Sequence, residues 1–451
     1  MDARSFSGTT SLLDNQWDFA LAPALTPDGI DPNPEFFRGI VVHPLILAEG
    51  LSTLGLLSTF RYDRPVPDFL AVGYDPILTA NGDRLRIESF SACNGVLARL
   101  DLLAESFESG QIGHGTTNVD VTPLSQQALG RIRANDLVHL SVGRDQIRVA
   151  STTEHIEERK VEMPSRWIRG LGNASELQEP LELLVDVSAS LARKFLASVP
   201  NPSAAEKSGF LSLSRGELRI GRRATPGSVA VSHIARLSTA KVFLADIQRL
   251  RIYGPALPDS GSAVVFEFLL PDARLSYTLT PHHLRGFSGE GALLESLSGA
   301  EVEDDADLIS AVLAFEARVE IDHLARETAL STERVRNGLS VLQSNGRIGW
   351  DLYEQAFFHR ELPMDSTRVE KDNPRLVAAQ KLVDTHSIDA VKDHRGHFRV
   401  KSGKNVYLVI LQENSALCSC PWYSRHSGNR GSCKHVLAVR IQTGHLSTNT
   451  P

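Results

Sequence analysis

Three of the four cysteines of this chain lie within sixteen residues near its C-terminus. Cys418 and Cys420 are separated by one residue, twelve residues follow, and Cys433 and His435 are again separated by one residue. Thiolates and imidazoles are ligands that zinc prefers, and four of them complete a tetrahedral site without a position for water. The spacing therefore predicts a structural, non-catalytic zinc site made of Cys418, Cys420, Cys433 and His435. His426 is an alternative ligand, but it falls in a polar loop and we expect it to face solvent.

The residues around this pattern predict a small folded unit. Residues 405–411 have the composition of a strand, which turns near 413–415 into a second strand that ends in the Cys-x-Cys pair. Residues 434–442 carry apolar side chains at helical spacing, with His435 in the first turn. Two strands and a helix held by one ion form a ββα zinc finger, in which metal binding and folding are coupled.

The Cys-x-Cys, twelve-residue, Cys-x-His pattern resembles the SWIM zinc finger, and Pro421, Trp422 and Lys434 fit the usual shape of that motif. The longer layout resembles bacterial SWIM zinc finger proteins, in which a long N-terminal region precedes the finger. The resemblance implies zinc binding and a role in DNA or protein interaction. It also implies a second class of partner, because some bacterial members look like companions of MoxR-type AAA+ ATPases and von Willebrand A-domain proteins.

The charge of the chain is unevenly distributed. Residues 366–451 contain 13 Lys and Arg against 6 Asp and Glu, a net charge of +7, and the remaining 34 basic and 48 acidic residues give −14. A basic module on an acidic chain favours a polyanionic partner, although the module could instead dock on the acidic body of its own chain. For nucleic acid, the candidate contact residues in or beside the ligand-bearing loop are Arg425, Arg430, Lys434 and Arg440.

Residues 304–363 resemble a winged helix-turn-helix. Three segments with helical spacing are followed by an alternating stretch at 347–352, and Ser331 is a natural N-cap for the third helix, predicted at 332–344. A helix that reads bases usually presents more basic or amide side chains than this one, which carries Glu333 and Gly338. We therefore expect a packing or protein-contact role for this helix rather than DNA readout.

The sequence pattern of the first 300 residues predicts folded domains, but it contains no recognisable catalytic or binding motif. The expected organisation is an irregular arm over 1–35, a mixed α/β domain over 36–200 and a smaller β-rich domain over 206–300. Alternating residues predict strands at 83–90, 137–142, 211–214, 217–220 and 264–268, Gly170 to Asn173 predict a break, and 181–198 has helical spacing. With the winged-helix-like segment at 304–363 and the finger module at 366–451, the expected fold class is α+β multidomain with β-rich N-terminal domains.

Several function classes are disfavoured by the sequence. No run of 18 apolar residues predicts a membrane-spanning helix, and the first residues lack the apolar core of a secretory signal. No catalytic arrangement of carboxylates, nucleophiles or histidines is apparent, so we do not expect an enzyme. The resulting hypothesis is a cytoplasmic, non-enzymatic zinc protein that binds nucleic acid through its basic module, and the alternative is a protein–protein adaptor whose finger docks a partner such as an AAA+ ATPase.

Overall fold

The chain forms two compact units. The first consists of Met1–Trp167, Pro180–Phe287 and Phe315–Ala317, and the second of Ile168–Glu179, Ser288–Ala314 and Arg318–Pro451. The computed structural model describes residues 11–13, 16–18, 24–26, 29–31, 35–60, 76–143, 146–160, 165–201, 208–258, 262–281, 302–313, 316–360, 362, 374–392, 394–412, 415–426 and 432–443.

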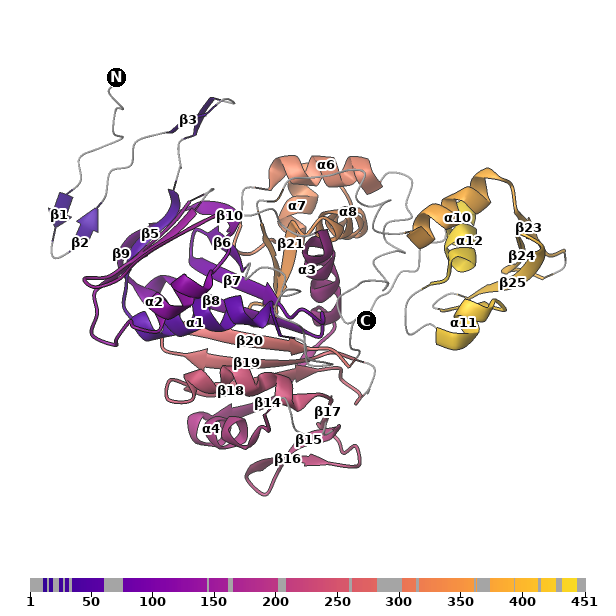
Figure 1. The fold of residues 1–451 in the computed structure, drawn as a ribbon. Helices are drawn as coiled ribbons and strands as arrows, with labels where there is room; N and C mark the ends of the chain where they lie inside the picture. Colours follow the sequence, from indigo (N-terminus) through magenta and orange to yellow (C-terminus); the bar gives the residue numbers. More distant parts are fainter. Residues whose placement is uncertain are drawn as a thin grey trace. The chain divides into compact units, whose positions relative to one another are not determined.

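An eight-stranded antiparallel sheet is the largest element of the first unit (Figure 1). Strand β8 pairs with β20, so strands from the predicted segments 36–200 and 206–300 lie side by side in this sheet. Both segments also contribute to one hydrophobic core, so the boundary predicted between 200 and 206 does not separate two cores. The strand order is β10 (His114–Asn118), β6 (Ile77–Asn81), β7 (Arg84–Phe90), β8 (Val96–Leu103), β20 (Ala273–Leu279), β19 (Val264–Leu270), β18 (Arg249–Gly254) and β14 (Glu182–Ser188).

The two faces of this sheet differ in chemistry, because successive side chains of a strand point to opposite faces. Leu85 and Ile87 of β7 enter the hydrophobic core, while Arg86 between them belongs to the opposite face. That opposite face is also buried, and it holds a cluster of ion pairs. Asp101 lies 3.1 Å from Arg86, 3.4 Å from Arg99 and 3.5 Å from Arg274.

Smaller sheets and short helices complete the first unit. The predicted irregular arm contains two short hairpins in its described residues, β1 (Ser11–Leu13) with β2 (Gln16–Asp18) and β3 (Ala24–Thr26) with β4 (Gly29–Asp31). A five-stranded sheet has the order β13 (His155–Arg159), β12 (Gln146–Ala150), β11 (Val138–Gly143), β5 (Glu35–Val41) and β9 (Phe107–Ile112), and a three-stranded sheet has the order β16 (Glu217–Gly221), β15 (Gly209–Ser214) and β17 (Val229–Val231). The helices are α1 (Pro44–Leu57), α2 (Pro123–Leu129), α4 (Ala189–Ser198) and the 3-10 segments η2 (Ala104–Ser106) and η3 (Ile234–Phe243).

Two local predictions are wrong. The segment predicted as one helix over 181–198 is strand β14 followed by helix α4, because β14 pairs with β18 at the edge of the large sheet and tertiary pairing overrides the helical spacing. The predicted break at Gly170 to Asn173 lies inside helix α3 (Ser165–Gln178). Gly172 is needed there for close packing, since a Cβ atom at this position would lie 2.3 Å from the carbonyl oxygen of Gln343.

Three helices and a hairpin follow α3 in the second unit. They are α6 (Val302–Val312), α7 (Ile321–Thr328), α8 (Thr332–Ser344), β21 (Ile348–Asp351) and β22 (Ala356–His359). Helix α8 has the predicted bounds, and the Ser331 side chain caps it by accepting a hydrogen bond from the Arg334 amide at 3.3 Å. Val319 adds an antiparallel bridge to Phe357, and all of these elements share one core.

Helix α8 is enclosed on more than one side. A Cβ atom on Gly338 would lie 2.6 Å from Ile309 Cδ1, so this glycine allows α6 and α8 to approach closely. Gln343 is only 4% exposed, and its backbone carbonyl lies against Gly172 of α3. The C-terminal half of α8 therefore packs against α3 within this unit.

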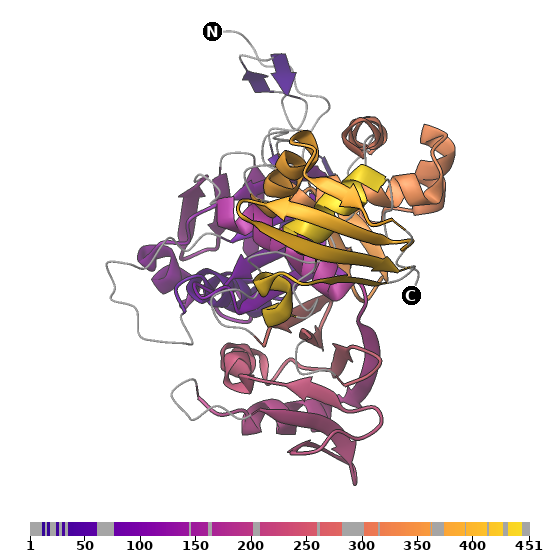
Figure 2. The ribbon, with the colours of Figure 1, turned by 90° about the vertical axis from the view of Figure 1, so that its right-hand side faces the viewer.

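The C-terminal part of the second unit is a four-stranded antiparallel sheet with three helices, which is larger than the predicted two strands and one helix. The strand order is β23 (Ile388–Ala390), β24 (His397–Ser402), β25 (Asn405–Gln412) and β26 (Ser415–Cys418). Figure 2 shows strands of this sheet lying side by side. Helices α10 (Pro374–Asp384) and α12 (Lys434–Thr443) pack together on one face of the sheet, and α11 (Pro421–His426) follows β26. We call residues 374–443 the finger, and they have their own core, to which three cysteines contribute.

None of the helices in the described part of the chain is both long and apolar enough to cross a bilayer.

Candidate metal centre

Two pairs of residues from separate parts of the finger form the candidate centre. Cys418 is the last residue of β26, and Cys420 immediately precedes α11. Cys433 immediately precedes α12, and His435 lies in the first turn of that helix. Short spacing within each pair places both of its side chains at one point of the fold, and the packing of α12 on the sheet brings the two pairs together.

The turn between Cys418 and Cys420 is held by the neighbouring strand. The Ser419 amide donates to the Leu408 carbonyl at 3.0 Å, and the Leu408 amide donates to the Ser419 hydroxyl at 2.9 Å. At the end of the β25–β26 pairing, the Ser419 hydroxyl thus accepts the hydrogen bond that a backbone carbonyl would otherwise accept. This arrangement fixes the direction in which both cysteine side chains leave the backbone.

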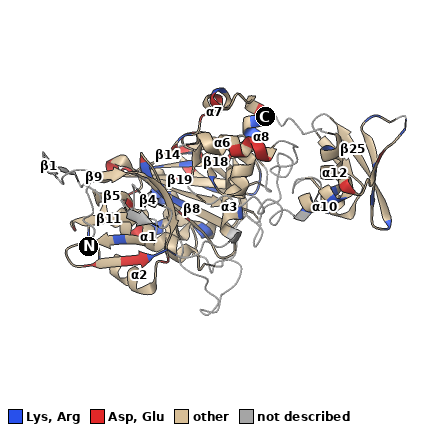
Figure 3. Cartoon of the chain, turned by 90° about the horizontal axis from the view of Figure 1, so that it is seen from above, with Lys and Arg blue, Asp and Glu red and all other residues tan. Residues whose placement is uncertain are grey.

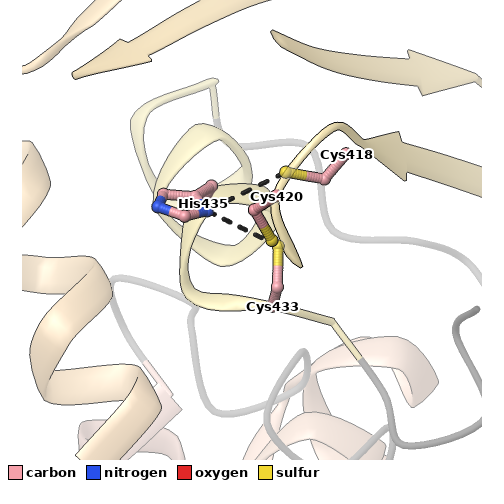
Figure 4. A group of neighbouring side chains, drawn as sticks. All are labelled: Cys418, Cys420, Cys433 and His435. Carbon is pink, nitrogen blue, oxygen red and sulfur yellow. Dashed lines mark hydrogen bonds between the residues drawn. The ribbon is translucent and has the colours of Figure 1, made fainter. Parts of the chain in front are cut away.

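The four side chains converge on one point (Figure 4). Their donor atoms all lie within 4.8 Å of one another, and all four residues are buried. His435 Nδ1 lies 3.8 Å from Cys418 Sγ and 4.0 Å from Cys433 Sγ. A tetrahedral zinc ion with ordinary bond lengths would separate such donor pairs by about 3.6–3.8 Å. The donor set therefore fits Zn²⁺, and the distances between the donor atoms would need to shorten only slightly when the ion binds.

The imidazole of His435 faces the sulfurs through Nδ1. Its Nε2 atom is buried and has no hydrogen-bond partner among the described residues. The ring packs against Tyr407, with the two ring centroids 4.5 Å apart. The geometry therefore assigns Nδ1, and not Nε2, as the nitrogen available to a metal.

The thiols have very different proton affinities. A hydrogen bond from Cys418 lowers the pKa of Cys433 to about 4, with further help from His435 and from the Val436 amide at the start of α12. The same hydrogen bond and burial raise the pKa of Cys418, and burial raises the pKa of Cys420. Without a cation, repulsion and burial oppose three thiolates in this space, and a divalent cation removes that obstacle.

A second layer of contacts supports the metal-binding segments. Arg375 of α10 donates to the Ser432 carbonyl at 2.9 Å, and its guanidinium lies 4.5 Å from the centre of the Trp422 ring. The Tyr423 amide donates to Cys420 Sγ at 3.3 Å. Sequence reasoning missed Arg375, because it lies more than forty residues before the first ligand and no local pattern marks it.

The four candidate nucleic-acid residues have different environments. Arg425 is exposed on α11, and Lys434 is half-buried at the start of α12. Arg440 is only 6% exposed and donates to the Ser432 hydroxyl at 3.4 Å, so it supports the fold from inside instead of presenting a surface charge. Arg430 lies outside the described residues, as does the side chain of His426.

Comparison with known proteins identifies the finger. Residues 404–442 match the family model of the SWIM zinc finger. No curated protein matches the sequence of the chain.

Three of the solved structures that are similar to part of this chain contain PCNA proteins. Proliferating Cellular Nuclear Antigen from Entamoeba histolytica has a TM-score of 0.36 at 13% identity, over 55% of this chain and 99% of that one. A. fulgidus PCNA bound to the C-terminal region of FEN-1 has a TM-score of 0.38 at 16% identity, over 55% and 98% of the two chains. The PCNA2-PCNA3 complex from Sulfolobus tokodaii has a TM-score of 0.37 at 11% identity, over 54% and 99%.

The metal centre itself lies inside the matched segment, since all four clustered residues fall between positions 404 and 442. Its donor set and geometry fit one structural zinc ion. The chain therefore carries a SWIM zinc finger at residues 404–442.

Proposed function

We propose that the finger binds the phosphate backbone of nucleic acid and that its zinc ion has a structural, non-catalytic role. The observation that carries this proposal is the excess of exposed Lys and Arg over exposed Asp and Glu in the finger, whose charged positions are coloured along the chain in Figure 3. Its described surface has two exposed carboxylates, Asp384 and Asp389. The same surface has seven exposed basic side chains: Lys381, Lys392, Arg395, Arg399, Lys401, Lys404 and Arg425.

Zinc would supply the fold that presents these charges. Four protein ligands leave no open coordination position, so the ion has no site at which to activate water. The ligands lie next to the basic residues in the chain, because Lys434 stands between Cys433 and His435. Three thiolates around Zn²⁺ carry a net charge of about −1, which offsets only part of the surrounding positive charge.

Binding of this kind would have little sequence preference. The winged-helix interpretation of 304–363 requires an accessible recognition helix, and the packing of α8 does not favour one. Arg334 is engaged by Asp305 at 2.9 Å, and Gln343 is buried beside α3. Base readout requires free side chains in a groove, whereas backbone binding requires only accessible cations.

A salt titration of the full-length protein tests this proposal. Fluorescence anisotropy would follow its binding to labelled 20-nucleotide single strands and 20-base-pair duplexes at increasing salt. Four phosphate contacts predict a slope of log affinity against log salt of roughly −3. Scrambling the oligonucleotide sequence should change the affinity little. Absence of binding at low salt, or an affinity that does not respond to salt, would contradict the proposal.

A protein-adaptor role is the second candidate, and a specific surface favours it. The face of the finger sheet opposite α10 and α12 exposes Val406 (60%), Leu408 (40%) and Leu417 (48%). Contiguous exposed apolar residues often mark a protein-binding surface. Given the resemblance described above, a MoxR-type AAA+ ATPase or a von Willebrand A-domain protein is the partner to test first. Binding of that purified partner after nuclease treatment, and its loss in Leu408→Glu, would favour the adaptor role.

A further inference from the structure

A cleft of about 510 Å³ lies within the finger, and none of the four metal-binding side chains lines it. Its volume is within the range of ordinary small-molecule sites. Its walls come from the end of α10, the turn that follows it, the ends of β23 and β24, and the first residue of α12. The lining residues are Ala378, Lys381, Leu382, Thr385, His386, Ser387, Asp389, Lys401, Ser402, Gly403 and Lys434.

Three lysines from three different elements line this cleft. Lys381 belongs to α10, Lys401 to β24 and Lys434 to α12. No ion pair joins any of them to a carboxylate in the described part of the chain. Cations that converge without a carboxylate partner raise the local positive potential and favour an anionic ligand.

The other polar groups of the lining are hydroxyl groups, the imidazole of His386 and a single carboxylate. Thr385 and Ser387 lie next to each other, with their side-chain oxygens 2.8 Å apart. Asp389 is the one acidic residue of the lining, and Arg399 stands directly opposite it in the neighbouring strand. The Thr385 hydroxyl donates to the Lys381 carbonyl at 2.7 Å, so the cleft would attract an anionic phosphate group through its net positive lining.

We infer that this cleft holds a backbone phosphate, with its attached sugar, of the nucleic acid bound by the finger. The inference rests on the proposed function and adds the residues that would do the binding. A lysine ammonium binds phosphate as a point charge, so three lysines tolerate different backbone positions without reading bases. Because Lys434 lies between two metal ligands, the cleft would form only when the finger holds its ion.

The test compares two triple variants of the full-length protein. The cleft variant carries Lys381→Gln, Lys401→Gln and Lys434→Gln. The control variant removes three exposed charges of the second unit outside the cleft lining: Arg326→Gln, Lys392→Gln and Arg395→Gln. Both are titrated with the labelled 20-nucleotide single strand at several salt concentrations. Zinc content of one ion per chain confirms that each variant has folded its finger.

The cleft variant should lose about tenfold or more in affinity at low salt, and its salt slope should fall in magnitude by about 0.7–0.9, the contribution of one phosphate. The control variant should lose less than about threefold. Equal losses in the two variants would overturn the cleft while leaving the proposed function intact. A wild-type protein that does not bind the strand would overturn both.

Lysine acetylation of the wild-type protein gives an independent readout that does not depend on folding of a variant. Bound oligonucleotide should protect Lys381, Lys401 and Lys434 from an acetylating reagent and leave Lys392 reactive. Protection of Lys392 with the three cleft lysines still reactive would place the nucleic acid elsewhere on the finger and overturn the inference.

Discussion

Removal of ligand side chains provides the most direct test of the metal centre. Wild-type protein should contain one zinc ion per chain, and Cys418→Ser with Cys433→Ser should contain none. A serine hydroxyl does not ionise at neutral pH and is a poor zinc ligand, so each change removes both a donor and a negative charge. Cys93→Ser is the matched control, because Cys93 is buried in the first unit and is not part of the cluster.

The size of the effect follows from the four-ligand geometry. Structural zinc sites in small fingers bind with an apparent free energy of about 10–16 kcal/mol at neutral pH. An even share for each ligand is about 2.5–4 kcal/mol, so Cys433→Ser alone should weaken zinc binding by about 10²–10³-fold. Cys93→Ser should leave the affinity within about twofold of the wild-type value.

Competition with a chromophoric chelator measures the affinity, and elemental analysis measures the zinc content. Amide hydrogen exchange then reports the fold: β25 and β26 should lose protection when zinc is lost, because the ligands belong to the core of the finger. Strands β7 and β8 of the first unit should keep their protection. Unchanged zinc content in the double cysteine variant would refute the assignment of these ligands.

Three further predictions concern the rest of the chain. Burial, Arg347 and Arg360 lower the pKa of His359 to about 3. In the unfolded chain the pKa of a histidine is near 6.5, so between about pH 6.5 and 3 the unfolded state binds more protons than the folded state. The free energy of unfolding of this segment should therefore fall by about 2 kcal/mol between pH 7 and pH 5. His359→Phe should remove most of that loss, as measured by hydrogen exchange of 348–359 at both pH values. Gly338→Val should destabilise the same segment by about 1–3 kcal/mol, because its side chain would meet α6, and it should leave the salt slope of nucleic-acid binding unchanged; a changed slope would implicate α8 in binding. Removal of residues 366–451 should leave a protein that unfolds cooperatively by calorimetry, since the finger has its own core; aggregation of that shortened chain would show that the parts depend on one another.

Local patterns were sufficient to predict the metal centre. In Cys-x-Cys and in Cys-x-His the two ligands are only two positions apart in the sequence. They therefore lie close together in any fold, and the pairs can be recognised without the tertiary structure. The same holds for α8, where the Ser331 cap and the apolar spacing define the helix within a few residues. Such signals are contained in short segments, so they can be read without knowledge of the tertiary structure.

Only the tertiary structure decided which segments share a core and which surfaces remain accessible. Residues 182–188 have helical spacing, but pairing with β18 makes them a strand, because hydrogen bonds to a distant partner outweigh a weak local preference. Arg440 is a cation in a basic sequence, yet its position on α12 turns it inward to Ser432. Lys381, Lys401 and Lys434 are separated by twenty and thirty-three residues in the chain, and the packing of α10, β24 and α12 places them around one cleft. The sequence by itself therefore determined the metal-binding residues, whereas the shared sheet and the basic cleft depend on long-range packing that no short segment encodes.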